Sequence, residues 1–112
     1  MRQDYANCIR DVECVLNTPF LFDAETLFVA NFLKSRPDNI RSFALIDHYI
    51  LDENEIYIVV FSSDSYLKIS RPLINIEFSV DSIKNLLNRK MNKDRRRKIE
   101  GVRKNFCDLK AS

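Results

Sequence analysis

The chain has 112 residues, of which 46% are hydrophobic and 30% charged, a balance typical of one globular domain rather than a disordered chain. Its single glycine, Gly101, leaves no glycine-rich loop to approach phosphate groups, which argues against nucleotide hydrolysis, kinase chemistry and dinucleotide-dependent redox chemistry. The net charge of +2 hides an asymmetry, because residues 1–80 carry 7 basic and 12 acidic side chains, whereas residues 81–112 carry 11 basic and 4 acidic ones.

The sequence lacks the patterns that would place the chain in a membrane or outside the cell. No apolar run approaches the roughly 20 residues of a membrane span. Acidic Asp4 stands where a signal peptide would have its apolar region. The cysteines Cys8, Cys14 and Cys107 are odd in number and lack the spacing of metal ligands. We therefore expect an intracellular protein with reduced thiols, no metal and no cofactor.

The N-terminal third shows the spacing of amphipathic helices. Residues 3–16 place apolar side chains three or four positions apart, which predicts a helix. Pro19 ends it, because proline disfavours the helical conformation in the residue before it. Asp23 is a good N-cap for a second helix over residues 24–35. Residues 1–36 are therefore predicted to form a helical N-terminal segment.

The middle of the chain changes to the β-branched and aromatic composition of strands. The pattern predicts three strands, over residues 40–47, 55–61 and 66–70, the first of which could run on to Ile50. Short polar connections between them favour an antiparallel meander. Residues 73–79 are predicted as either a short edge strand or an ordered loop, so the sheet has three or four strands.

The C-terminal third returns to helical spacing. Asp81 can cap a helix over residues 82–91. A final helix is expected over residues 94–110, with an apolar stripe formed by Ile99, Val102, Phe106 and Leu109. Helices outside a small meander define an α+β fold. We expect a single domain over residues 1–112, with its core in residues 40–110.

The central predicted strand is apolar on both faces. Ile56, Ile58 and Val60 point to one face, and Tyr57, Val59 and Phe61 point to the other. An antiparallel sheet with one wet face would alternate apolar and polar residues instead, so something must cover each side. The C-terminal helices can cover one face. Either the N-terminal helices or a second protein covers the other, and in the second case Tyr57, Val59 and Phe61 would bind the partner.

Two groups of residues are of the types that could carry chemistry. His48 could act as a base and Cys107 as a nucleophile, but no further polar residue completes a catalytic constellation, so we expect no enzymatic activity. The acidic residues Asp47, Asp52, Glu53 and Glu55 lack the turn glycine and the alternating oxygen ligands of a calcium loop. They are expected to form a solvated acidic rim.

The region from Arg89 to Lys104 carries nine basic residues against two acidic ones. Such density favours anionic partners through counterion release, and the cluster Arg95-Arg96-Arg97-Lys98 would also suit a nuclear import signal. Alternatively, these basic residues form only a solvated helix face with no partner. Direct nucleic-acid binding is the alternative function, although the helix must also pack its apolar stripe.

The stretch from about Ile40 to Leu109 resembles the globular head of a chromosome-segregation family, the Spc-twenty-five subunit of the Ndc-eighty kinetochore complex. The likeness is carried by Phe43 with Ile46-Asp47, by Glu55 to Val59, by Tyr66 to Ile69 followed by Pro72, by Leu86-Leu87-Asn88, and by Val102 to Phe106. It covers roughly 70 of the 112 residues, and the order and spacing of the motifs are its evidence. The long coiled coil that precedes the head in that family has no counterpart in residues 3–35, which show no sustained heptads.

The resemblance implies an RWD-like α+β fold and a non-enzymatic subunit of a nuclear, kinetochore-bound complex. It implies pairing with an Spc-twenty-four-like subunit in a hetero-oligomer that links the microtubule-binding complex to the inner kinetochore. The expected partner-binding residues are those of the sheet face and of the basic helix: Tyr57, Val59, Phe61, Arg95, Arg96, Arg97 and Arg103. The basic residues would meet an acidic receptor segment or, as the alternative, nucleic acid.

Overall fold

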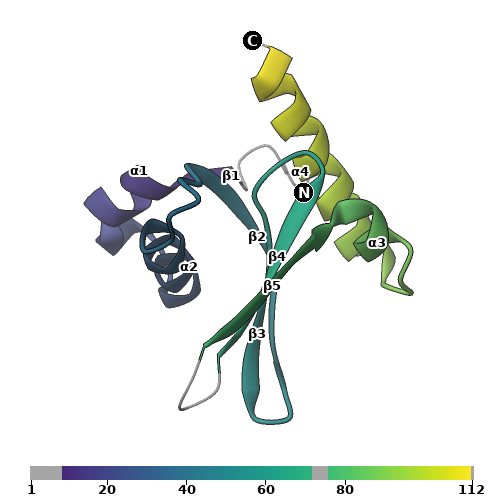
Figure 1. Ribbon diagram of the computed structural model, residues 1–112, viewed down its shortest axis with the longest axis horizontal. Coiled ribbons are helices and arrows are strands. Elements are labelled where there is room, and N and C mark those ends of the chain that lie inside the picture. Colours follow the sequence, from purple (N-terminus) through teal and green to yellow (C-terminus); the bar gives the residue numbers. More distant parts are fainter. Residues whose placement is uncertain (1–8, 72–75, 112) are drawn as a thin grey trace.

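The computed structural model describes residues 9–71 and 76–111, with side chains described as far as Asp108, and shows an α+β fold (Figure 1). The elements are β1 (Ile9–Asp11), α1 (Val12–Asn17), the 3-10 turn η2 (Pro19–Leu21), α2 (Ala24–Lys34), β2 (Ser42–Leu51), β3 (Asn54–Val60), β4 (Ser65–Arg71), β5 (Glu77–Ser82), α3 (Ile83–Leu87) and α4 (Lys93–Ala111). The predicted class and the order of helices, meander and C-terminal helices are confirmed. No helix among the described residues is long and apolar enough to cross a membrane.

The sheet has the order β1-β2-β3-β4-β5, and every neighbouring pair is antiparallel. The three predicted strands are present as β2, β3 and β4, and β2 runs past Ile50 to Leu51. The register between β2 and β3 shifts between Leu45 and Asp47, a local bulge. Residues 77–82 form β5 at the sheet edge, so the strand alternative for this region is correct, while residues 72–75 lie outside the described part.

The predicted helix over residues 3–16 is wrong at residues 9–11, whereas residues 12–16 are helical as part of α1. Residues 9–11 instead form β1, in which Arg10 lies opposite Phe43 of β2. Asp11 then caps α1, because its Oδ1 accepts a hydrogen bond of 2.9 Å from the backbone N–H of Cys14. Helical spacing was present in the sequence, but pairing with β2 satisfies the backbone groups of residues 9–11 as well as a helix would. Residues 3–8 lie outside the described part.

The helix predicted over residues 82–91 is shorter and begins one residue later than expected. Ser82 is the N-cap of α3, and its Oγ accepts from the backbone N–H of Asn85 at 3.2 Å. Asp81 belongs to β5 and accepts from the Nδ2 of Asn85 at 2.8 Å. The helix ends at Leu87. By contrast, Asp23 caps α2 as predicted, with its Oδ1 2.8 Å from the backbone nitrogen of Thr26.

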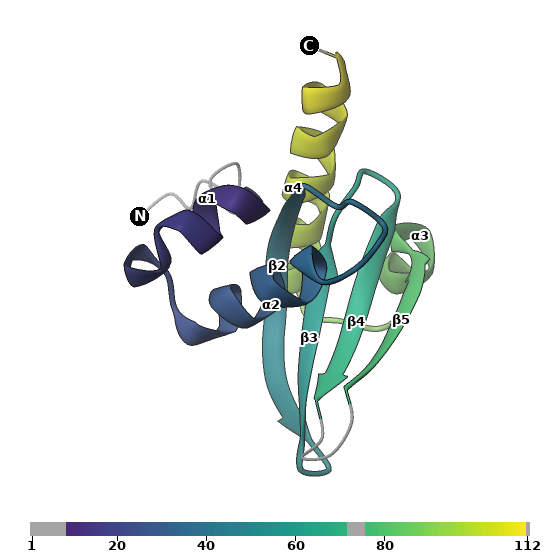
Figure 2. The same cartoon turned by 60° about the vertical axis from the view of Figure 1, so that its left-hand side comes forward.

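Helices cover both faces of the sheet (Figure 2). On one face α3 and α4 close the α3/α4 core, formed by Ala44, Ile46, Ile56, Ile58, Val60, Tyr66, Ile83, Leu86, Ile99, Val102 and Phe106. On the other, α1 and α2 close the α1/α2 core, formed by Val12, Val15, Val29, Ala30, Leu33, Phe43, Tyr57, Val59, Leu67 and Ile69. The central strand is apolar on both faces because it serves both cores.

Coverage of the sheet is incomplete at one end and along one edge. The tip of the β2–β3 hairpin lies at the bottom of Figure 1, away from all helices, and Ile50 and Leu51 near it are exposed. The edge strand β5 is exposed over residues 77–80. These two regions therefore carry exposed apolar side chains on an otherwise well-packed sheet.

Candidate interaction surfaces

The sheet face that was expected to meet a partner is covered within the chain. Val59 is fully buried, Tyr57 is 2% exposed, and both belong to the α1/α2 core. Phe61 is half-buried against the same core. The assignment of Tyr57 and Val59 to partner binding is therefore corrected: α1 and α2 remove both from solvent, the alternative that the sequence also allowed, while Phe61 is covered only in part.

Aromatic packing fixes α2 over the middle of this face. The ring centroid of Tyr57 lies 4.8 Å from that of Phe28 on α2 and 4.5 Å from that of His48 on β2. Burial raises the pKa of the Tyr57 hydroxyl above its ordinary value, with the neighbouring Arg71 opposing the shift. The guanidinium carbon of Arg71 lies 4.6 Å from the centroid of Phe28, a cation–π contact between β4 and α2.

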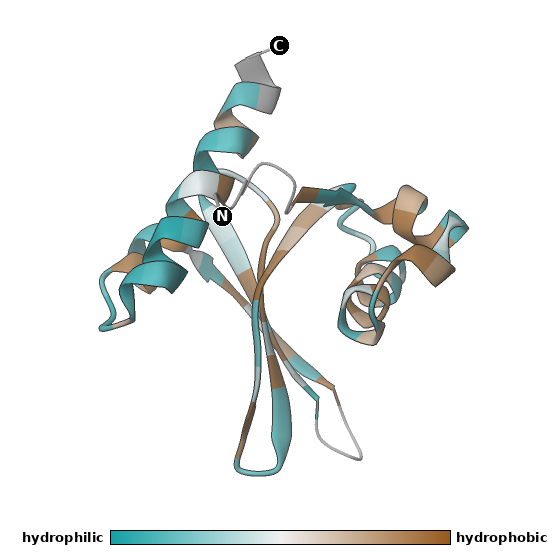
Figure 3. Cartoon of the chain, turned by 180° about the vertical axis from the view of Figure 1, so that it is seen from behind, coloured by the Kyte–Doolittle hydropathy of each residue, from teal (hydrophilic) through white to brown (hydrophobic). Residues whose placement is uncertain are grey.

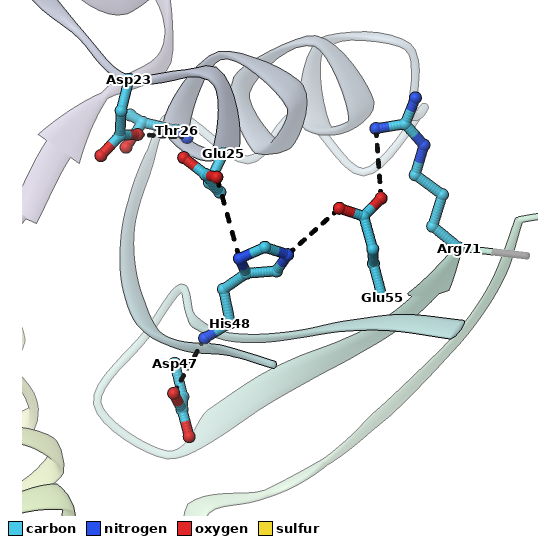
Figure 4. Close-up of polar contacts among 7 residues, drawn as sticks. All are labelled: Asp23, Glu25, Thr26, Asp47, His48, Glu55 and Arg71. Carbon is cyan, nitrogen blue, oxygen red and sulfur yellow. Dashed lines mark hydrogen bonds and ion pairs between the residues drawn. The ribbon is translucent and has the colours of Figure 1, made fainter. Parts of the chain in front are cut away.

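His48 lies between two carboxylates beneath α2 (Figure 4). Its Nδ1 is 3.9 Å from an Oε1 of Glu25 on α2, and its Nε2 is 3.4 Å from an Oε1 of Glu55 on β3. Glu55 in turn lies 3.7 Å from an Nη of Arg71 on β4. The cluster thus connects α2 to the strands β2, β3 and β4. We interpret His48 as a structural residue that holds the helix on the sheet.

The chemistry considered for His48 and Cys107 has no geometric support. His48 stacks on Tyr57 beneath α2, whereas Cys107 is an exposed residue of α4, the helix of the other layer. A nucleophile and its base must lie within hydrogen-bond reach of each other. Because the sheet separates these two residues, they do not form a catalytic pair.

The four acidic residues near the β2–β3 hairpin are dispersed. Asp47 forms an ion pair with Arg95 of α4, and Glu55 belongs to the His48 cluster. Asp52 and Glu53 form the exposed turn between β2 and β3. Across residues 9–71 and 76–111, no group of three or more His, Cys, Asp or Glu side chains is arranged to hold a metal ion.

Most of the arginines proposed for the basic surface hold α4 in place. Arg95 forms an ion pair with Asp47 of β2, and its guanidinium carbon lies 5.7 Å from the centroid of Tyr49. Arg96 donates to the carbonyl oxygen of Leu87 at 2.6 Å. The Nε of Arg103 donates to the carbonyl oxygen of Ser63 at 2.8 Å.

Arg97 differs from these three arginines because it is exposed and forms no ion pair within the described residues. Lys98 resembles them, since its Nζ lies 3.3 Å from the carbonyl oxygen of Ile46. Most residues of α4 are hydrophilic (Figure 3), and the apolar residues Ile99, Val102 and Phe106 are buried. The density of basic residues in the sequence therefore overstated the number of side chains free to meet a partner, although, among the described residues of α4, only the charge of Arg95 is paired with a carboxylate.

A different surface emerges at the edge strand, and we call it the β5 surface: Ile76, Phe78 and Val80 with the outward edge of β5. These side chains are 47%, 50% and 53% exposed. The residues from Ile74 to Asp81 alternate apolar and polar side chains, the pattern of a strand with one apolar face. That alternation was the signal in the sequence that could have found this surface.

Phe78 lies at the boundary between the β5 surface and α2. Its ring is edge-on to that of Phe32, with centroids 5.6 Å apart, and the guanidinium carbon of Arg36 lies 4.1 Å from its centroid. Val80 has no such cover. The apolar face that α1 and α2 cover therefore extends to β5, where Phe78 and Val80 remain about half exposed.

Comparisons of the chain with protein-family models, curated proteins and solved structures find no significant match. What the structure defines is a class: an α+β domain with a five-stranded antiparallel meander covered by helices on both faces, within the described residues.

Proposed function

We propose that this chain is a non-enzymatic protein-interaction subunit whose partner covers the β5 surface. The observation that carries the proposal is the exposure of Phe78 and Val80, 50% and 53%, at the open edge of a sheet in which the residues opposite them on β4, Ile69 and Leu67, are buried. Exposed apolar residues that continue a core are a common feature of protein–protein contacts. The partner thus covers the apolar side chains of β5 as α2 covers those of β3 and β4 on the same face.

The complex in which this subunit works is proposed from the resemblance of residues 40–109 to the Spc-twenty-five head. We assign the chain to a nuclear chromosome-segregation assembly, the kinetochore, where it pairs with an Spc-twenty-four-like subunit and helps link microtubule-binding and inner-kinetochore proteins. The exposed Arg97 of α4 is available for an acidic receptor segment. In this arrangement the β5 surface serves the obligate pairing and α4 serves the receptor.

The test combines reconstitution with localisation. Proteins that co-purify with the tagged full chain are identified by mass spectrometry, and each candidate is co-expressed with the chain to reconstitute a binary complex of defined mass. The double variant Phe78→Thr, Val80→Thr should lose the complex, because threonine keeps strand propensity while removing apolar area.

The matched control is Phe20→Thr, Leu21→Thr, which removes two exposed apolar side chains of η2, outside the sheet, and should keep the complex. A reconstituted complex that survives the β5 double variant contradicts the assignment of the surface. A fluorescent fusion that never concentrates at kinetochores of dividing cells contradicts the assignment to that assembly.

Nucleic-acid binding, the alternative function, has less support than the charge of the sequence suggested. Arg95, Arg96, Lys98 and Arg103 are engaged with Asp47 or with backbone carbonyl oxygens. A mobility-shift experiment at low salt addresses this alternative directly. Binding that weakens steeply with salt would restore it, because each released counterion contributes to the salt dependence.

A further inference from the structure

The edge strand β5 can accept another strand. Within the described part of the chain, β5 pairs with β4 only, so its outer edge carries backbone N–H and C=O groups with no strand partner. Such an edge is a template for pairing with a second chain. Extended peptides commonly bind proteins in this way, with main-chain hydrogen bonds supplying affinity and alternate side chains supplying specificity.

One face of an added strand would continue two apolar rows of the α1/α2 core. Tyr57, Ile69 and Phe78 lie opposite one another on β3, β4 and β5. Val59, Leu67 and Val80 form the neighbouring row in the same way. In each row the first two residues are buried and the β5 residue is half exposed. Apolar side chains of the added strand on this face would cover Phe78 and Val80.

The opposite face of β5 is polar and acidic. Because side chains alternate across a strand, Glu77, Ser79 and Asp81 all point to the α3/α4 side. Glu77 is exposed, and none of the ion pairs among the described residues involves it. Directly opposed side chains of opposite charge stabilise a strand pair, and like charges destabilise it. The added strand would therefore carry basic side chains on this face.

The same charges disfavour self-pairing of β5 with a second copy in the register centred on Ser79. Antiparallel pairing of β5 with itself around Ser79 uses the whole of residues 77–81 and keeps Phe78 opposite Val80. That register also places Glu77 directly opposite Asp81 of the second copy, twice. Charged residues on edge strands are a known protection against self-pairing. This register is therefore unfavourable for a second copy, whereas a basic strand would meet Glu77 with a favourable charge.

We propose that β5 binds an extended segment of a partner protein by strand addition, the segment alternating apolar residues, which cover Phe78 and Val80, with basic residues, which face Glu77. This inference rests on the proposed function and specifies the chemistry of the partner. It differs from the acidic-receptor role of α4, because the two surfaces select opposite charges.

The experiment uses the full chain and short, terminally blocked peptides in which valine and lysine alternate. Binding is measured by fluorescence polarisation, and amide chemical shifts of the labelled protein locate it. We expect saturable binding with the largest shifts in residues 77–82. A peptide of the same composition with its valines in one block, and one with alternate backbone amides methylated, should both bind at least about tenfold more weakly, because alternation and main-chain hydrogen bonds are lost.

Charge selection is tested with Glu77→Lys. This variant should weaken binding of the valine–lysine peptide about fivefold and should bind the corresponding valine–glutamate peptide better than the native chain does. Glu100→Lys is the matched control, since it reverses an exposed acidic residue of α4, outside the sheet, and should leave both affinities unchanged.

The outcomes separate this inference from the proposed function. Absence of peptide binding, binding located on α4, or equal affinity for the methylated peptide overturns strand addition at β5. If the reconstituted complex is nevertheless lost with Phe78→Thr, Val80→Thr, the proposed function stands without it. A concentration-dependent dimer in analytical ultracentrifugation that Glu77→Lys strengthens would identify a second copy as the occupant and also overturn the inference.

Discussion

At the scale of single residues, the helix N-caps show how one side chain can fix where a helix begins. Asp11, Asp23 and Ser82 each accept a hydrogen bond from a backbone N–H three residues later, at the start of α1, α2 and α3. An N-cap side chain satisfies one of the four backbone donors that a helix start leaves free. Asp23 is the cap whose position the sequence predicted correctly.

The Asp23 cap should make stability depend on pH. Hydrogen bonds from Thr26 lower the pKa of the Asp23 carboxyl below its ordinary value of 3.8. Since the folded pKa is the lower one, the stabilisation is present at neutral pH and is lost as the pH falls through 3.8 and then through the folded value. Asp23→Ala should lower the free energy of unfolding by about 1 kcal/mol at neutral pH, and the difference should shrink below about pH 4.

Urea unfolding of the native chain and the Asp23 variants across pH measures this effect. Asp23→Asn is the control, because its side-chain oxygen still caps the helix but does not titrate in this range. It should retain most of the stability and show a flatter pH dependence than the native chain. A difference between the native chain and Asp23→Ala that grows toward acidic pH would contradict the assigned role.

A second residue-scale feature is backbone strain at the β2–β3 turn. Asp52 and Glu53 adopt φ values of 51° and 69°. Two-residue hairpin turns of this kind favour asparagine and glycine, because other residues pay a steric cost for positive φ. The other described residue with positive φ is Asn39, a type that tolerates this conformation.

Glu53→Gly should therefore stabilise the protein by about 0.5–1 kcal/mol, since removing Cβ relieves more strain than the added flexibility of the unfolded chain costs. Thermal and urea unfolding provide the measurement. Glu53→Ala keeps Cβ and should give no comparable gain. Destabilisation by glycine would mean that the Glu53 side chain contributes more than the turn conformation does.

At the scale of elements, α4 shows how one helix divides its residues between anchoring and exposure. Ile99, Val102 and Phe106 are buried on the sheet, as their spacing predicted. Side chains on the flanks of this stripe add polar contacts, among them the Arg95–Asp47 ion pair. The side chain of Arg95 is 32% exposed, so its contribution is that of a partly screened pair.

The two kinds of arginine should respond differently to charge reversal. Arg95→Glu places an acidic side chain against Asp47 and should lower the free energy of unfolding by about 1 kcal/mol or more. Arg97→Glu should change it by less than about 0.5 kcal/mol, because Arg97 is exposed. Urea denaturation compares them, and equal effects would contradict the division of roles on α4.

At the scale of the whole molecule, the two cores share one sheet. Ile56, Ile58 and Val60 of β3 pack in the α3/α4 core, while Tyr57 and Val59 of the same strand pack in the α1/α2 core. A strand that serves two cores couples their stability, because loss of either layer exposes the apolar residues of the face beneath it. The two helical layers should therefore not unfold independently.

Truncating either core should destabilise one common unfolding transition. Ile99→Ala in the α3/α4 core and Leu33→Ala in the α1/α2 core each remove buried methylene or methyl groups and should cost about 2–5 kcal/mol. Circular dichroism and tyrosine fluorescence should report the same midpoint for each variant. Separate midpoints by the two probes would show that the layers are independent units.

Local patterns in the sequence predicted a large part of the fold, and for identifiable reasons. The strand composition around Ile56–Val60 and the helical spacing of Ile99, Val102 and Phe106 reflect which side chains an element must bury, a property carried by near neighbours in sequence. The prediction failed at residues 9–11 and at Asp81. In both places a strand pairing with a distant segment competed with a local helical preference.

The sequence by itself determined the α+β class, the meander, the capping of α2 by Asp23 and the demand that both sheet faces be covered. Only the tertiary structure decided what covers them and what stays exposed: α1 and α2 bury Tyr57 and Val59, Asp47 engages Arg95, and Phe78 and Val80 remain at the open edge. The reason is physical, since periodicity and capping act over a few residues, whereas burial and ion pairing depend on segments brought together by the fold.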